Sequence, residues 1–273
     1  MLLPLVVSCG RTGSVANPDV ILATTTSTQD SGLLDALLPV FEAQTGYRVK
    51  AIAVGTGEAL QMGRQGDADV LLAHAPKAEQ EFMVSGAGSQ RALVMHNDFV
   101  LVGPPGDPAG VDAVGSAEEA FQRIAAEQAV FVSRGDDSGT HKKEQALWQL
   151  AGIPQPQGDW YQESGSGMGQ TLRIASEKEG YTLSDRGTYL ALRDTLNLKV
   201  VAEQHPPLLN PYHVIQVNPD TFPHVNEQGA QAFIEFLLAD ATQEMIGQFG
   251  RDRFGEPLFV PDAGKSEDAL GVL

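Results

Sequence analysis

The chain has 273 residues, a length that accommodates one large domain or two domains of ordinary size. Hydrophobic residues make up 42% of it, charged residues 19%, and it has one cysteine, which excludes a disordered chain, a collagen-like repeat and a disulfide framework. Its 18 Lys and Arg residues face 35 Asp and Glu residues, giving a net charge of −17, so nucleic acid and anionic membrane surfaces are not expected partners.

The N-terminus begins with an apolar run, 2–7, that is too short to span a bilayer. The following Val6-Val7-Ser8-Cys9 is similar to a bacterial lipobox, which predicts Cys9 as a lipidated residue and 10–19 as a tether. No Lys or Arg precedes the run, and the segment is shorter than a usual signal peptide. A misassigned start codon would explain both departures. The alternative is a hydrophobic N-terminus without a targeting role.

Short apolar strands alternate with amphipathic helices along the rest of the chain, a pattern typical of α/β layers around parallel sheets. We predict strands at 20–23, 48–54, 69–73, 99–105, 129–133, 199–202 and 212–217. Helices are predicted at 33–45, 58–65, 117–128, 141–150, from about 171 onward, and as one long helix at 228–249. The polar segment 262–273 is predicted to be a frayed tail.

The order of these elements predicts two lobes. Strands near Val100 and Ile215 bracket about 110 residues that have strands and helices of their own. We therefore expect a signal and tether at 1–19, a first lobe at 20–103 plus 208–261, a second lobe at 104–207, and a tail at 262–273. A cleft between two lobes is a preferred place for a small ligand.

Hydroxyls and glycines are concentrated where predicted strands end and helices begin. The first such run, 24–31, has more hydroxyls than a helix cap requires and lies where α/β sheets bind ligands, which favours ligand contact by this loop. The second, Gly55-Thr56-Gly57, is a weaker signal, because many turns look like it.

The third run, 133–141, is the most specific. Arg134 leaves a buried strand and is followed by a turn and the helix start Ser138-Gly139-Thr140, which together supply a cation, hydroxyls and free amides. Such a helix N-terminus favours anions. The alternative is a capped helix with Arg134 paired to Asp136 or Asp137 on the surface. A fourth run, Gly167-Met168-Gly169, is either a connector or a further set of backbone donors.

The 24–27 run, the 133–141 run and Gly167-Met168-Gly169 together resemble the tungstate-binding proteins of Tup-type ABC transporters, over about 20–261. The resemblance implies a type II periplasmic-binding-protein fold, with two α/β lobes joined by two crossover strands. It implies ligand contacts from Thr25, Ser27, Arg134, Ser138 and Thr140, to which geometry adds Thr56. Secondary candidates are Thr26, Gly57, Gly139, Gly167, Met168 and Gly169.

The resemblance also implies an extracytoplasmic binding protein, without cofactor or resident metal, that passes a tetrahedral oxyanion to a permease. Tungstate and molybdate are fully deprotonated near neutral pH and need donors only, whereas phosphate also needs an acceptor for its proton. Asp136 and Asp137 leave phosphate open; our preferred interpretation is that they orient Arg134 or cap the helix. Sulfate is smaller than tungstate and molybdate, and donors fixed at a wider spacing would leave it underbonded. We expect a monomer, anchored to the membrane by lipid at Cys9, in which Trp148 and Trp160 report lobe closure.

An enzyme is the rival class. Ser138 and His141 lie three residues apart, as a nucleophile and base could, but no orienting third group and no Gly-x-Ser-x-Gly elbow accompany them. The six histidines lack the spacing of a zinc site. We therefore expect a binding protein that has no catalytic residues.

Overall fold

The computed structural model describes residues 17–136 and 138–271, and only the backbone of Ser27. The lipobox, Cys9 and Asp137 lie outside the described residues. The chain divides into two compact units: unit 1 comprises 1–73, 78–91 and 215–236, and unit 2 comprises 74–77, 92–214 and 237–273. This division assigns 74–77, 92–103, 208–214 and 237–261 differently from the expected lobes, whose boundaries stay a prediction.

Unit 1 is built on strands in the order β9-β3-β1-β2, of which β2, β1 and β3 run parallel to one another. β1 (Asp19–Thr25) pairs with β2 (Arg48–Val54) and β3 (Val70–Ala73), and β9 (Leu209–Val217) contributes its last residues. The helices are α1 (Thr26–Asp30), α2 (Leu33–Thr45), α3 (Thr56–Gln65), most of α4 (Pro76–Val84) and most of α9 (Glu227–Leu238). Strands 20–23, 48–54 and 69–73 and helix 33–45 are thereby confirmed, while α4 was not predicted.

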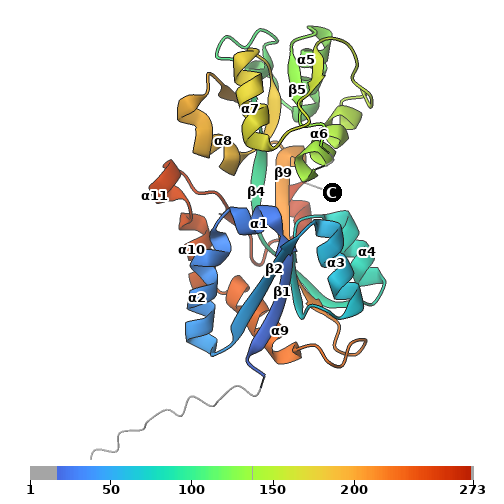
Figure 1. Cartoon of the computed structure of the whole chain (residues 1–273), viewed down its shortest axis with the longest axis vertical. Coiled ribbons are helices and arrows are strands. Elements are labelled where there is room, and N and C mark those ends of the chain that lie inside the picture. Colours follow the sequence, from blue (N-terminus) through green and yellow to red (C-terminus); the bar gives the residue numbers. More distant parts are fainter. Residues whose placement is uncertain (1–16, 137, 272–273) are drawn as a thin grey trace, which may run out of the picture. The chain divides into compact units, whose positions relative to one another are not determined.

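The strands of unit 1 are covered by helices on both faces, because alternate residues of a strand point to opposite sides. A methyl group added at Gly229 of α9 would lie 2.5 Å from Val20, and the Phe41 ring of α2 meets Phe233 of α9 edge-on at 5.2 Å. On the other face, Ala23 joins Leu60 of α3 in a buried cluster. Figure 1 shows α2 and α3 on opposite sides of the β1 and β2 pair.

Unit 2 contains most of the long strand β4 (Gly88–Gly103), which pairs antiparallel with β7 (Thr182–Asp185), β8 (Lys199–Ala202) and β10 (Val260–Pro261). A second, parallel pair is formed by β5 (Phe131–Ser133) and β6 (Tyr161–Glu163). The helices are α5 (Ala117–Ala126), α6 (Gly139–Leu150), α7 (Met168–Glu177), α8 (Arg186–Leu192), α10 (Asp240–Gln248) and α11 (Arg251–Phe254). Trp148 is fully buried in its core, against Phe121 at 4.6 Å and Phe131 at 5.1 Å.

The predicted long helix at 228–249 is wrong, because the chain makes two helices there. Ala239 adopts an extended conformation, with φ −68° and ψ 142°, between α9 and α10. The side-chain amide of Gln243 donates to the Leu237 carbonyl oxygen at 2.8 Å, and so satisfies a carbonyl left free by the end of α9.

The prediction of a frayed tail is wrong for 262–271, which the structure holds against unit 2. The Asp262 carboxylate is fully buried and lies 2.5 Å from His96 Nδ1 and 2.8 Å from Lys265 Nζ. Burial alone raises the pKa of Asp262, but its hydrogen bonds with His96 and Lys265 outweigh this and lower it. Glu267 lies 2.8 Å from the buried His213. Side-chain contacts of the buried Asp262 and of Glu267 therefore fix the segment, although its composition is polar.

Candidate functional site

The hydroxyl run of unit 1 lies at the carboxyl end of β1 and continues into α1. Thr24 Oγ1 donates to the Leu72 carbonyl oxygen at 2.8 Å, so this hydroxyl binds the neighbouring strand. Thr25 Oγ1 lies 2.7 Å from Thr28 Oγ1 and accepts from the Thr28 amide at 3.3 Å, which caps α1. Thr25 is buried and Thr26 is exposed. The predicted contacts therefore lie at a strand end and in a first helical turn.

The start of α3 lies beside this run in unit 1, because the register of the parallel strands pairs Thr25 with Val54. Gly55 precedes the helix in an extended conformation, and no side chain in the described part of the chain caps it. A methyl group at Gly55 or Gly57 would meet nothing within 4 Å. The first amides of α3 and the half-buried Thr56 thus border open space.

Arg134 directly follows β5 in unit 2 and is held by Asp136. Its Nη2 donates to Asp136 Oδ2 at 2.5 Å, with side-chain exposures of 17% and 22%, so the pair is neither fully buried nor a free surface ion pair. The second carboxylate oxygen, Oδ1, accepts from the Ser138 amide at 3.2 Å. Asp136 therefore orients Arg134 and binds the residue that begins α6, an arrangement that both the preferred interpretation and the capped-helix alternative include.

The electrostatics of this pair fit an anion site. Burial raises the pKa of Asp136, but hydrogen bonds from Ser138 and Arg134 outweigh this and lower it, so the carboxylate is ionised and both its oxygens accept protein donors. Arg134 Nε is buried and has no hydrogen-bond partner within the part of the chain that the structure describes. A buried donor without an acceptor costs about 1–3 kcal/mol, which an acceptor from a ligand would offset.

The first turn of α6 carries the remaining donors of the most specific run. Ser138 is the N-cap, and its Oγ accepts from the His141 amide at 3.3 Å. Gly139 and Thr140 are the first two residues of the helix, which begins two residues earlier than predicted. Thr140 is 8% exposed, and a methyl group at Gly139 would meet nothing within 4 Å.

The Gly167-Met168-Gly169 run forms the start of α7, which begins earlier than the predicted 171. The parallel register of β5 and β6 pairs Ser133 with Glu163 and so places the loops after these strands side by side. Ser164 connects them, because its Oγ donates to the Arg134 carbonyl oxygen at 3.2 Å and lies 2.8 Å from Thr171 Oγ1. A methyl group at Gly167 would meet nothing within 4 Å.

The structure thus collects the candidate residues into two sets, each within one unit. In unit 1 they are Thr25, Thr26, Ser27, Thr56 and Gly57, of which Ser27 is placed by its backbone alone; in unit 2 they are Arg134, Ser138, Gly139, Thr140, Gly167, Met168 and Gly169. Sequence reasoning missed Thr28, which its spacing of one helical turn from Thr25 could have revealed. It also missed Ser164 as the link between two loops, because a strand as short as β6 leaves no periodic signal.

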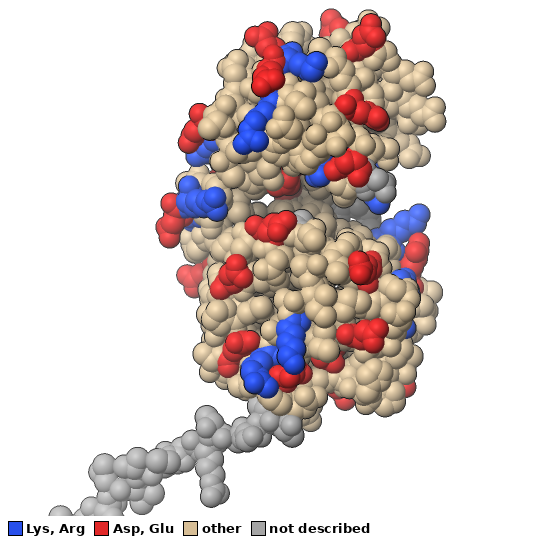
Figure 2. All heavy atoms as spheres, viewed as in Figure 1, with Lys and Arg blue, Asp and Glu red and all other residues tan. Residues whose placement is uncertain are grey.

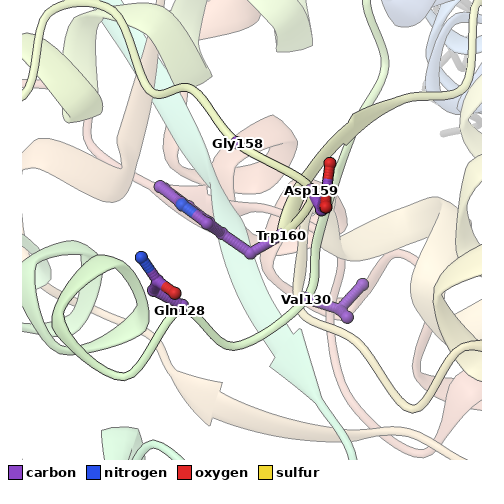
Figure 3. A pocket seen from close by; sticks show the side chains of 5 residues that line it. All are labelled: Gln128, Val130, Gly158, Asp159 and Trp160. Atoms are coloured by element: carbon purple, nitrogen blue, oxygen red, sulfur yellow. The ribbon is translucent and has the colours of Figure 1, made fainter.

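The structure does not pair Ser138 and His141 as the enzyme alternative would require, and the pocket near Trp160 is separate from the candidate donors. Ser138 Oγ binds the backbone amide of His141, and the ring Nε2 of His141 lies 3.1 Å from Gln145 Nε2, which is not the arrangement of a nucleophile and its base. A surface pocket of about 350 Å³ in unit 2 is lined by Gln128, Val130, Gly158, Asp159 and Trp160 (Figure 3), none of them a candidate residue.

Residues 17–136 and 138–271 contain no group of three His, Cys, Asp or Glu side chains that could hold a metal ion. None of the helices described there combines the length and the apolar character needed to cross a membrane.

Comparison with known proteins gives consistent matches over most of the chain. The model of the PBP superfamily domain matches residues 12–241. The tungstate-binding protein TupA of Peptoclostridium acidaminophilum is 50% identical over 92% of this chain and 88% of its own length. TupA of Campylobacter jejuni is 42% identical over 89% of this chain and 90% of its own length. The solved structure of TupA from Desulfovibrio alaskensis G20 matches with a TM-score of 0.86 and 45% identity, covering 90% of this chain and 99% of that one.

Proposed function

Because the chain belongs to the PBP superfamily and, within it, to the family of tungstate-binding proteins, we propose that it captures tungstate, or the similar molybdate, for an ABC importer. The relatives are binding proteins, and the family is extracytoplasmic, so the chain acts as a carrier outside the cytoplasm. It delivers the bound anion to a permease, which is its protein partner.

The observation that carries this proposal is the pairing at Arg134. Asp136 fixes the guanidinium through Nη2, while Nε remains buried without an acceptor in the described chain. Ser138, Thr140 and the first amides of α6 and α7 add hydroxyl and N–H donors in the same unit. A set made of donors around one fixed cation suits an anion that carries no proton.

We propose Thr25, Ser27 and Thr56 in unit 1, and Arg134, Ser138 and Thr140 in unit 2, as the side chains that bind the anion. Backbone donors would come from the secondary candidates, which are Thr26, Gly57, Gly139, Gly167, Met168 and Gly169.

Phosphate is the weaker candidate, because its proton needs an acceptor; of the two candidate acceptors, Asp136 is engaged by protein donors, and Asp137 lies outside the described residues. Both oxygens of the Asp136 carboxylate already accept hydrogen bonds, from Arg134 and from the Ser138 amide. Sulfate carries no proton near neutral pH, but it is smaller, so donors spaced for tungstate leave it underbonded. A comparison of tungstate with sulfate is therefore more informative than one with phosphate, because these two anions differ in size and not in protonation.

Anchoring and assembly are part of the proposal. We propose that lipid at Cys9 tethers the protein to the membrane and that the protein acts as a monomer. Mass spectrometry of the protein isolated from membranes tests the lipid, and light scattering tests the monomer.

Isothermal titration calorimetry of the protein against tungstate, molybdate, sulfate and phosphate at one pH tests the ligand. We expect tungstate or molybdate to bind at least a hundredfold more tightly than sulfate or phosphate, a difference of about 2.8 kcal/mol. Preferential binding of phosphate would contradict the proposal, as would the absence of binding heat with all four anions.

A further inference from the structure

Lys143 is a cation of unit 2 that the donor set above does not include. It lies three residues after Thr140 and four after Gly139 in α6, so all three occupy one face of the helix. The helix rises by about 6 Å over four residues, and helical side chains lean toward the N-terminus. Lys143 therefore lies directly beneath the first turn that carries the proposed anion donors.

The Lys143 ammonium has an apolar and neutral environment. Its Nζ donates to the Leu209 carbonyl oxygen at 3.2 Å and lies 5.8 Å from the centre of the Phe99 ring. The side chain is half-buried, and no carboxylate of residues 17–136 or 138–271 forms an ion pair with it. The other half-buried Lys and Arg side chains in the described chain each have such a partner: Arg91, Arg134, Arg186 and Lys199.

The charged groups on the neighbouring elements are engaged elsewhere. On β4, both carboxylate oxygens of Asp98 accept from Arg186 at 2.6 Å. Along α6, Glu144 accepts from Trp148 at 3.2 Å and from Tyr161 at 2.8 Å, and the ring of His141 lies beside Gln145. The neighbouring Lys142 is exposed. From β9, the group that Lys143 meets is the Leu209 carbonyl oxygen.

We propose that Lys143 is an electrostatic residue of the oxyanion site: its ammonium stabilises the bound dianion from beneath the first turn of α6, and anion binding draws a proton onto it. This inference rests on the proposed function. It adds a residue that affects affinity without a place among the proposed ligand contacts, and it makes anion capture dependent on pH.

The protonation behaviour of Lys143 gives the direction of the effect. Burial lowers the pKa of Lys143 to about 8, so near pH 8 the free protein holds the amine partly neutral. A nearby dianion favours the charged form and raises this pKa in the complex. Binding is therefore strongest below pH 8 and weakens as the pH rises through 8 and 9. If the pKa in the complex is about 9, affinity falls about threefold between pH 8 and 9, and about tenfold in total from well below pH 8 to well above pH 9.

The test is calorimetry of tungstate binding at pH 8 in two buffers with different ionisation enthalpies, Tris and HEPES. The difference between the two binding heats gives the number of protons taken up. For the unmodified protein we expect roughly half a proton, since the pKa of the free amine is close to the pH of the experiment.

Three variants test whether Lys143 is the group that takes up the proton when tungstate binds. Lys143→Met should abolish the uptake and weaken binding severalfold at pH 7. Lys143→Arg keeps a permanent charge, so it should also abolish the uptake while retaining the affinity at pH 7. Lys142→Met removes the same charge from an exposed position of the same helix and should leave the uptake unchanged.

The outcomes separate the two proposals. Binding heats that do not depend on the buffer in the unmodified protein would overturn the role of Lys143 while leaving the proposed function intact. Uptake that persists in Lys143→Arg would assign the proton to another group and would also overturn it, even if Lys143→Met fails to fold. If tungstate gives no binding heat at all, the proposed function itself falls.

Discussion

Arg134 is the side chain on which the oxyanion proposal depends most. Its guanidinium is fixed by Asp136 and keeps a buried N–H without an acceptor in the described chain. We expect Arg134→Ala to weaken tungstate binding by about 1.5–3 kcal/mol, the range for a hydrogen bond to a charged group. Calorimetry measures the change.

Arg123→Ala is the matched control for Arg134→Ala. Arg123 also lies in unit 2, but it is 44% exposed and pairs with Glu119 one helical turn away. An exposed pair of this kind contributes little to stability, so affinity and folding should both be nearly unchanged. Equal affinities of the two variants would remove Arg134 from the site.

The hydroxyl run shows what residue types alone can predict. The sequence shows a row of hydroxyls after β1, but it does not show which of them already bind protein atoms. Thr24 donates to the backbone of β3, so its proton is used, whereas the Thr25 oxygen accepts from α1. The partner of Thr24 lies 48 residues further along the chain, and only the fold brings the two together.

At the scale of elements, the first turns of α3, α6 and α7 place the candidate donors. Ser138 caps α6 through its oxygen, so its removal affects both the helix and the proposed anion contact. We expect Ser138→Ala to lower the free energy of unfolding by about 1 kcal/mol. It should also weaken tungstate binding, because a donor is lost. Chemical denaturation and calorimetry measure the two effects separately.

Ser116→Ala separates capping from binding. Ser116 is the N-cap of α5, and its side chain accepts from the Glu119 amide at 3.2 Å, in the same way as Ser138 in α6. It is not among the proposed ligands. The control should therefore lose a similar amount of stability and no affinity. If both variants lose stability alone, Ser138 acts only as a cap.

Elements with a clear period were predictable from sequence, and short or interrupted ones were not. The apolar face of α2 and its Gly46 stop, with φ 78°, match the structure closely. In contrast, α9 and α10 carry one continuous apolar period, and the break at Ala239 depends on a Gln243 contact that no local pattern contains. The helix starts at Gly139 and Met168 were predicted two and about three residues late, because the sequence of a first turn resembles that of a loop.

At the scale of the whole molecule, the net charge of −17 opposes the approach of a dianion. On the face shown in Figure 2, acidic and basic side chains are interspersed, so the repulsion comes from their sum. We expect the association rate of tungstate to rise about twofold or more when sodium chloride is raised from about 10 to 150 mM, because salt screens this repulsion.

Stopped-flow fluorescence measures this rate, since we predict that Trp148 and Trp160 respond to binding. Their rings lie 5.7 Å apart, and Trp148 donates to Glu144 of α6, the helix that begins at the proposed donors. A rate that falls as salt is added would mean that a local positive potential, and not the net charge, governs the approach.

The two compact units are interleaved along the chain, since each is assembled from three separate stretches. No single cut in the gene releases either one intact, and β4 and β9 each contribute residues to both. A recombination event that exchanged one half for that of a homologue would have to replace several stretches at once. We therefore expect the two halves to be inherited together, within one shared framework.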